Sequence, residues 1–301
     1  DRSPSRGLGD VYKRQFKDMA LQMLPQLLSA ALRKTGEDKT VCILVATSGD
    51  TGKAAMEGFC DVVGTKIIVF YPHGGVSAVQ QAQMATQAGE NVCVCAVRGN
   101  FDDAQTGVKK IFSAVSKDQL LEGKGVRLSS ANSINIGRLA PQVVYYYRAY
   151  ADLVQAGRIQ PGDKVDYVVP TGNFGDILAG YFAKEMGLPV GKLVCASNAN
   201  NVLTDFLRTG TYDARRTFYK TTSPSMDILI SSNLERLLYH VSGSSEKVAA
   251  WMQELSRTGK YTVDAETLAK IQESFAAGYA DDAEGAAEIK ARFDEDNYLW
   301  D

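Results

Sequence analysis

The chain has 301 residues, 45% of them hydrophobic and 23% charged, a composition typical of a globular protein with one large domain or two smaller ones. Its 33 basic and 35 acidic residues give a formal net charge of −2, which gives no support for a nucleic-acid partner. No run of 18 apolar residues occurs, so we expect neither a membrane-spanning helix nor a membrane partner.

Residues 1–15 are polar and basic, and no apolar central region of a signal peptide follows their arginines. We interpret them as a non-native adapter sequence and exclude them from the fold. The last residues, 297–301, stop on an apolar cluster. We therefore expect natural sequence to be missing at both ends.

Short runs rich in Val, Ile and Cys predict strands at 41–46, 66–71, 92–97, 126–129, 164–169 and 193–196. They show little polar alternation, which is typical of parallel strands buried on both faces. Amphipathic segments predict helices at 18–32, 52–62, 77–88, 101–116, 134–156, 176–186, 201–209, 225–239, 245–256, 265–277 and 282–294. Pro25 is expected to kink or split the first helix.

Strand–helix alternation followed by a helical tail predicts an open α/β fold. The first run of strands ends near residue 130, where we place a domain boundary, with domains at 16–130 and 131–301. The five cysteines are odd in number and lie mostly in apolar runs, which indicates reduced thiols and a cytoplasmic location. Cys93 and Cys95 are the one close pair, and a zinc site needs two further ligands, so no metal is expected.

Residues 46–52, Ala-Thr-Ser-Gly-Asp-Thr-Gly, follow a strand and open a helix. Small residues let the backbone approach a ligand, and the hydroxyl and N–H groups at a helix start can hold a carboxylate. A capped turn without any ligand explains the same residues equally well. A P-loop is excluded because its pattern needs Gly at position 47 and Ser or Thr at 54, where this chain has Thr47 and Ala54.

Residues 170–176, Pro-Thr-Gly-Asn-Phe-Gly-Asp, also lie between a strand and a helix. Two glycines around Asn-Phe predict a compact turn whose N–H groups converge, which is a plausible phosphate cradle at a helix start. Asp176 would suit the helix dipole even without a ligand.

Two further segments are ambiguous by themselves. Lys17, in Phe-Lys-Asp at 16–18, is indistinguishable from a solvated lysine at a helix start. In the segment 130–138, Asn135 is either a helix cap or a hydrogen-bond donor, and Arg138 is either a surface charge or a ligand for a second anion. A Ser-His-Asp triad is improbable, since the chain has two histidines and no G-x-S-x-G elbow.

Taken together and in this order, segments 16–18, 46–52, 130–138 and 172–176 resemble threonine synthase, with support from Ser-Met-Asp-Ile at 225–228. The resemblance runs from Phe16 to about Asp301. It implies a pyridoxal 5'-phosphate (PLP) enzyme of fold type II, the tryptophan-synthase-β type. In that fold two α/β domains, with mostly parallel sheets and helices on both faces, hold the cofactor between them.

The resemblance also implies residue roles. Lys17 would form the Schiff base with the cofactor and then move protons as general base and acid. Asp50 stands where related enzymes usually carry Asn beside the ring hydroxyl. The cofactor phosphate would be held by Gly172, Asn173, Phe174, Gly175 and Asp176, the substrate carboxylate by Ser48 and Thr51, and the substrate phosphate by Asn135 and Arg138.

The implied reaction converts O-phospho-L-homoserine and water into L-threonine and phosphate, the work of a carbon–oxygen lyase in threonine biosynthesis. We expect a monomer or weak homo-oligomer. The family's His-Gly-Pro-Thr-like stretch is replaced here by Tyr-Lys-Arg-Gln at 12–15, and its continuation after residue 301 is absent, so the chain resembles a fragment of the enzyme. Alternatives are a serine/threonine dehydratase, a β-replacing synthase, or an inactive fragment or non-catalytic module that binds phosphate ligands.

Overall fold

A computed structural model describes residues 16–47, 49–121 and 123–297. The chain forms two compact units, the first ending at Gln142 and the second beginning at Val143. This division falls later than the boundary predicted near residue 130. Residues 131–142 belong to the first unit because helix α6 (Ile136–Leu139) and the short helix η1 (Ala140–Gln142) pack against helix α2 (Phe16–Thr35).

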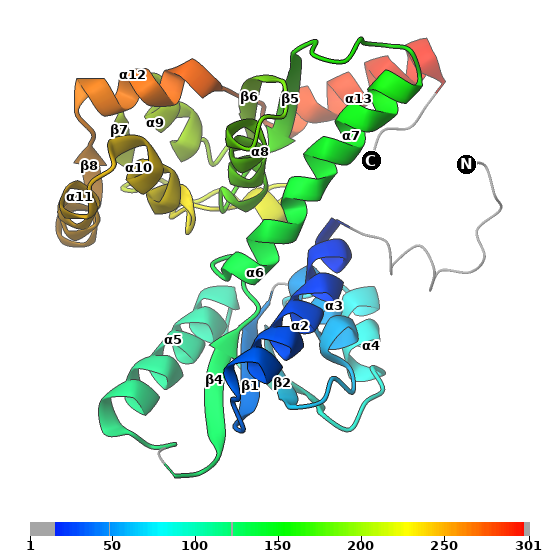
Figure 1. Ribbon diagram of the computed structural model, residues 1–301, viewed down its shortest axis with the longest axis vertical. Helices are drawn as coiled ribbons and strands as arrows, with labels where there is room; N and C mark the ends of the chain where they lie inside the picture. The colour runs from blue at the N-terminus through cyan, green and yellow to red at the C-terminus, as the bar shows by residue number, and fades with distance from the viewer. Residues whose placement is uncertain (1–15, 48, 122, 298–301) are drawn as a thin grey trace. The chain divides into compact units, whose positions relative to one another are not determined.

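The other elements of the first unit alternate between strand and helix, as the sequence predicts (Figure 1). They are β1 (Thr40–Ala46), α3 (Asp50–Phe59), β2 (Thr65–Pro72), α4 (Ala78–Ala85), β3 (Val92–Val97), α5 (Phe101–Asp118) and β4 (Val126–Ser130). All four strands are parallel, in the order β3-β2-β1-β4, which confirms the predicted open, parallel sheet.

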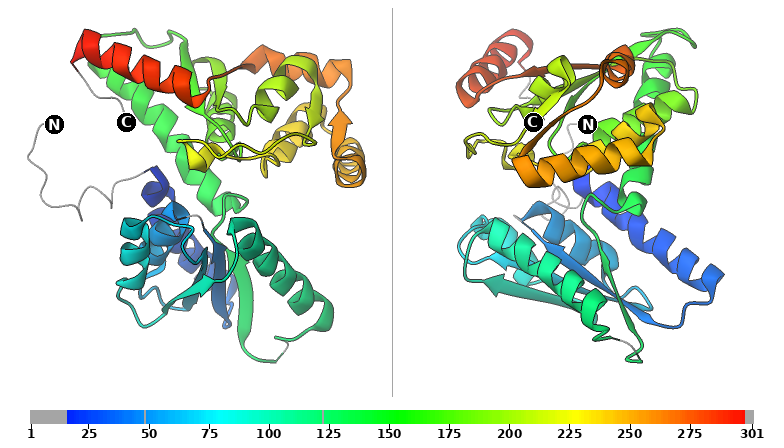
Figure 2. Two further views of the ribbon diagram at one scale, coloured as in Figure 1. Left: turned by 180° about the vertical axis from the view of Figure 1, so that it is seen from behind. Right: turned by 90° about the vertical axis from the view of Figure 1, so that its left-hand side faces the viewer.

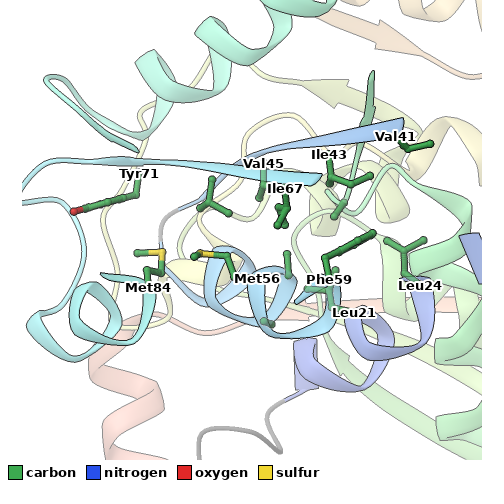
Figure 3. Packing of buried hydrophobic residues seen from close by; sticks show 14 residues of the cluster. Leu21, Leu24, Val41, Ile43, Val45, Met56, Phe59, Ile67, Tyr71 and Met84 are labelled. Carbon is green, nitrogen blue, oxygen red and sulfur yellow. The ribbon is translucent and has the colours of Figure 1, made fainter. Parts of the chain in front are cut away.

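The side chains of β1 alternate between two cores, one on each face of the sheet. Val41, Ile43 and Val45 point to the face covered by α2 and α3, where they meet Phe59 and Ile67 (Figure 3). The opposite core contains Leu44 and Ala46 of β1 with Ala104 and Val108 of α5, which covers that face (Figure 2). Burying a side chain of this size contributes roughly 1.5–3 kcal/mol, so both faces stabilise the strand that ends at the 46–52 segment.

The second unit contains two sheets. Its elements are α7 (Val143–Gln155), β5 (Val165–Pro170), α8 (Gly175–Glu185), β6 (Val190–Ser197), α9 (Val202–Thr209), β7 (Thr211–Asp213), η2 (Pro224–Met226), α10 (Leu234–Ser242), α11 (Ser245–Thr258), β8 (Lys260–Thr262), α12 (Ala265–Ser274), β9 (Phe275–Tyr279) and α13 (Asp282–Asp296). Strands β5, β6 and β9 pair in parallel, and β7 pairs with β8 antiparallel. Helix α8 packs on the central strand β6, and this places its first residues at the end of β5.

The split predicted at Pro25 is absent, and two predicted helices are wrong in extent. Pro25 does not split the first helix, because α2 runs without a break from Phe16 to Thr35. Pro25 offers no N–H to the Leu21 carbonyl four residues earlier. That carbonyl lies against Gly58 of α3, where any Cβ would collide with it, so α2 packs closely on α3 in the turn that precedes the proline.

The predicted helix 225–239 is helical only at 224–226 and from 234 onward. The intervening residues bind tertiary partners instead: the Leu229 carbonyl accepts from the Tyr212 hydroxyl, and the Ser231 N–H donates to that same hydroxyl. The predicted helix 265–277 ends at Ser274, and the residues that follow form β9 beside β6. Its Ala-rich sequence favours helix locally, and pairing with the buried strand overrides that preference.

In the described part of the chain, no helix is both long enough and apolar enough to cross a membrane.

Candidate active site

Lys17 lies in the first turn of α2 beside the start of α3. Its Nζ is 3.6 Å from Oδ2 of Asp50, and the two side chains are 19% and 37% exposed. Burial is the main cause that lowers the pKa of Lys17, and the nearby Arg138 guanidinium lowers it further, while Asp50 raises it. A desolvated lysine with a lowered pKa is a better nucleophile and a better proton acceptor near neutral pH than a solvated one.

The turn before α3 is shaped by Thr47 and two glycines. The Thr47 Oγ1 accepts hydrogen bonds from the N–H groups of Gly49 (2.9 Å) and Gly52 (2.8 Å). Gly49 has a φ of +135°, a conformation that an L side chain rarely adopts. This turn orients Asp50 toward Lys17 and leaves Thr51 half-buried in the first turn of α3. Ser48, predicted to hold a carboxylate, lies outside the described residues.

Asp18, the neighbour of Lys17, is fully buried and paired with Lys53 of α3. The Lys53 Nζ lies 3.0 Å from both carboxylate oxygens, and Lys53 is itself only 6% exposed. A buried charge has to be paired to be tolerated. The pair therefore fixes the first turn of α2, and with it the backbone of Lys17, against α3.

The two residues predicted to hold a second anion are both partly engaged with backbone groups. Arg138 is buried, and its Nη1 donates to the Ala131 carbonyl at 3.2 Å while its charge acts on Lys17. Asn135 caps α6: its Oδ1 accepts from the Gly137 N–H, and its Nδ2 donates to the Ser130 carbonyl. The first unit thus brings Arg138 close to Lys17, and it uses Asn135 to shape the turn that carries Arg138.

In the second unit, residues 172–176 join the end of β5 to the start of α8. Phe174 is buried and has a left-handed backbone, with a φ of 60°. The first four N–H groups of a helix have no partner within it, so the start of α8 at Gly175 is a suitable place for a phosphate. This is the geometry that the paired glycines predict.

The 172–176 turn is held from behind by two later segments. The Asn173 carbonyl accepts from the backbone N–H (3.2 Å) and the side-chain amide (3.0 Å) of the fully buried Asn233. The Ser232 hydroxyl donates to the Asn173 side chain at 3.2 Å. Gly172 packs on residues 225–228, the Ser-Met-Asp-Ile run. This contact relates the run to the 172–176 turn, although the two are far apart in the sequence.

Replacing Gly172 with alanine should destabilise the second unit. A Cβ there would lie 2.9 Å from Cγ1 of Ile228 and 3.2 Å from the Met226 Cα, too close for either backbone to avoid a shift. Such overpacking costs about 1–3 kcal/mol, which denaturant unfolding can measure. The matched control is Gly175→Ala, since a Cβ there meets its nearest atom, the Asn233 Nδ2, at 3.7 Å. Equal losses in both variants would contradict the close-packing explanation.

Asp176 is a buried carboxyl group with a raised pKa. Burial raises its pKa from the ordinary 3.8 to about 6, against the opposing effect of the Tyr146 hydroxyl. In the described structure its Oδ1 is buried without a hydrogen-bond partner, and the Tyr146 hydroxyl donates to the Asp176 backbone carbonyl at 2.9 Å.

This pKa predicts how stability changes with pH. Between pH 4 and 6 the folded state binds more protons at Asp176 than the unfolded state does, so ionisation of Asp176 destabilises the fold as the pH rises. Asp176→Asn should remove this component, which is at most about 1.4 kcal/mol per pH unit. Unfolding of the wild type and the variant at pH 4, 5, 6 and 7 measures it. A stability difference that stays constant across this range would refute the shifted pKa.

Several contributing residues were not found from the sequence. Gln80, Lys53 and Asn233 contact Asp50, Asp18 and Asn173 respectively. The one local signal was at Gln80, which follows Ser77 at the spacing of a capping box. The others stand on helices or loops where no spacing rule points to a partner.

No group of three or more His, Cys, Asp or Glu side chains that could hold a metal occurs among the residues that the structure describes.

Comparison with known proteins identifies the family. The family model described as "Pyridoxal-phosphate dependent enzyme" matches residues 15–287. Threonine synthase of Pseudomonas aeruginosa is 44% identical over 261 residues, covering 86% of this chain and 53% of that protein. Threonine synthase of Saccharomyces cerevisiae is 40% identical over 291 residues, 91% of this chain and 55% of the relative. The human protein "Threonine synthase-like 1" is 41% identical over 95% of this chain and 39% of its own length.

Two similar solved structures are also threonine synthases. PLP-bound threonine synthase from Brucella melitensis superposes with a TM-score of 0.85 at 43% identity, covering 95% of this chain and 59% of that one. The yeast enzyme gives a TM-score of 0.83 at 38% identity, covering 94% and 57%. The chain thus spans about half the length of the threonine synthases that it matches. The match to the family model covers most of the sequence, and the chain belongs to the pyridoxal-phosphate dependent enzymes.

Proposed function

We propose that this chain carries the PLP site of a threonine synthase, which converts O-phospho-L-homoserine and water into L-threonine and phosphate. The observation that carries the proposal is the state of Lys17: an amine with a lowered pKa, 3.6 Å from Asp50 and close to the Arg138 charge. Identity of 38–44% to threonine synthases supports the choice of reaction within the family.

The residues present fit the chemical groups of the cofactor. Its aldehyde requires an amine that is partly uncharged near neutral pH, and burial lowers the pKa of Lys17 in that direction. Its phosphate requires several N–H donors, and the turn 172–176 at the start of α8 supplies them. When bound, the cofactor supplies an electron sink for the bonds broken at the substrate.

We assign the remaining work to this chain's own side chains. Lys17 accepts the proton from the substrate α carbon and returns protons later, which is general acid–base catalysis by one amine. The Asp50 carboxylate stabilises the positive charge of that amine when it is protonated. The backbone and hydroxyl groups of 48–51 orient the substrate carboxylate. Arg138 attracts the substrate phosphate, which leaves from the γ carbon, while water adds at the β carbon in the overall reaction.

The experiment is a substrate comparison on the full 301-residue chain supplied with PLP. Phosphate and threonine formed in equal amounts from O-phospho-L-homoserine, and neither in Lys17→Ala, is the expected result. Ammonia and an oxo acid formed from serine or threonine, without phosphate chemistry, would instead assign a dehydratase. Ligand binding that survives Lys17→Ala, with no product from any amino acid, would assign a non-catalytic phosphate-binding module.

A further inference from the structure

We propose that Gln80 is a positioning residue that holds Asp50 in place for Lys17. Its Nε2 donates a hydrogen bond of 2.7 Å to Oδ1 of Asp50. The other carboxylate oxygen, Oδ2, is the one 3.6 Å from the Lys17 Nζ. One oxygen of Asp50 therefore contacts the Gln80 amide, and the other faces the Lys17 amine. Gln80, Asp50 and Lys17 lie on the helices α4, α3 and α2 respectively. This inference rests on the proposed role of Lys17.

Gln80 is itself held in one orientation. Its Oε1 accepts from the Ser77 N–H at 3.0 Å, and its own N–H donates to the Ser77 hydroxyl at 3.2 Å, which together form the capping box of α4. Because the amide oxygen of Gln80 accepts the hydrogen bond from the Ser77 N–H, the NH₂ group of the same amide faces Asp50. Gly49 leaves room for this amide, since any Cβ at position 49 would collide with it.

The amide suits this task chemically. It donates a hydrogen bond to the carboxylate without adding charge. Asp50 is 37% exposed at the start of a helix, so without Gln80 its side chain can turn toward water. The pKa of Lys17 is lowered mainly by burial and raised by Asp50, so a movement of this carboxylate changes the pKa of the amine.

A purely structural role, capping α4, is the competing explanation, and the chain offers a matched control for it. Ser77→Ala removes the other half of the same capping box, with an expected loss of helix stability of about 1 kcal/mol. It leaves the Gln80–Asp50 hydrogen bond intact. Two substitutions of Gln80 then probe Asp50 in opposite directions: Gln80→Leu removes the donor, and Gln80→Glu adds a negative charge.

The readout is the rate at which Lys17 reacts with acetic anhydride in the full chain without cofactor, located by mass spectrometry at several pH values. Only the neutral amine reacts, so the rate at a pH below the pKa follows the neutral fraction. The exposed Lys34, on the same helix, serves as the internal standard. Thermal unfolding followed by circular dichroism identifies any variant that fails to fold.

Gln80→Leu should accelerate the labelling of Lys17 about threefold, the change expected when a partly exposed ion pair is lost. Gln80→Glu should slow it, and Ser77→Ala should leave it unchanged while lowering the melting temperature. Equal or parallel effects of the two Gln80 variants, or a Ser77→Ala variant that reproduces them, would overturn the proposal. The labelling assay contains neither cofactor nor substrate. Its result can therefore be interpreted even if the chain lacks the proposed activity.

Discussion

Lys17→Ala is expected to reduce the turnover of O-phospho-L-homoserine by about 10⁴-fold, the upper end of what one general acid–base residue contributes. Under the proposed function this one amine both attaches the cofactor and moves the protons, so its loss removes two functions together. The proposal is supported by the lowered pKa of Lys17, to which burial and Arg138 both contribute. The measurement is phosphate release in the presence of PLP.

Lys34→Ala is the matched control, because Lys34 is exposed in the last turn of the same helix. It should retain the wild-type rate. A Lys17→Ala variant with more than about a tenth of the wild-type rate would mean that another group acts as the base, since general acid–base catalysis is worth at least about 10²-fold.

Lys53→Met is expected to lower the free energy of unfolding of the first unit by about 3–5 kcal/mol, because it leaves the carboxylate of Asp18 buried without its charge partner. Asp18 is 0% exposed and cannot turn toward water without moving the start of α2. Hydrogen exchange of peptides from β1 and α3 measures the effect locally. The chain's two tryptophans both follow residue 143, and one of them, Trp251, is buried in α11, so tryptophan fluorescence reports separately on the second unit, which should not change.

The double variant Asp18→Leu/Lys53→Met separates an unpaired charge from lost packing. Replacing both partners by apolar side chains of similar size is often close to neutral. The double variant should therefore recover most of the stability lost in the single one. If it is the less stable of the two, then the ion pair itself, and not the unpaired carboxylate, accounts for the loss.

The fold of the first unit was predictable because its strands are short apolar runs between amphipathic segments, although β1 is largely buried and β3, at the edge of the sheet, is only partly buried. Runs such as 41–46 and 92–97 are apolar along their whole length, and both are strands in the structure. The failures occurred where distant residues decide the conformation. Residues 275–277, Phe-Ala-Ala, extend the helical pattern of the preceding residues but pair with β6. Asp227 ends the short helix η2 because its carboxylate binds Asn198, Asn200 and Thr221 instead of allowing a helix to continue.

The candidate site was predictable only where the backbone itself is the binding group. The glycines of 49–52 and 172–175 mark turns before helices, and both turns exist. Lys17 was indistinguishable from a surface lysine until the other segments were considered with it. The side chains that set its environment, Asp18, Lys53 and Gln80, come from three helices, and no local pattern relates them.

The central claim is that Lys17 is the amine that binds the cofactor, and reductive trapping tests it most directly. The full chain is incubated with PLP, reduced with borohydride and digested, and the pyridoxyl adduct is located by mass spectrometry. A single adduct on Lys17, absent from Lys17→Ala and retained in Lys34→Ala, is the predicted result. Labelling spread over many lysines, or concentrated on a lysine other than Lys17, would contradict the account.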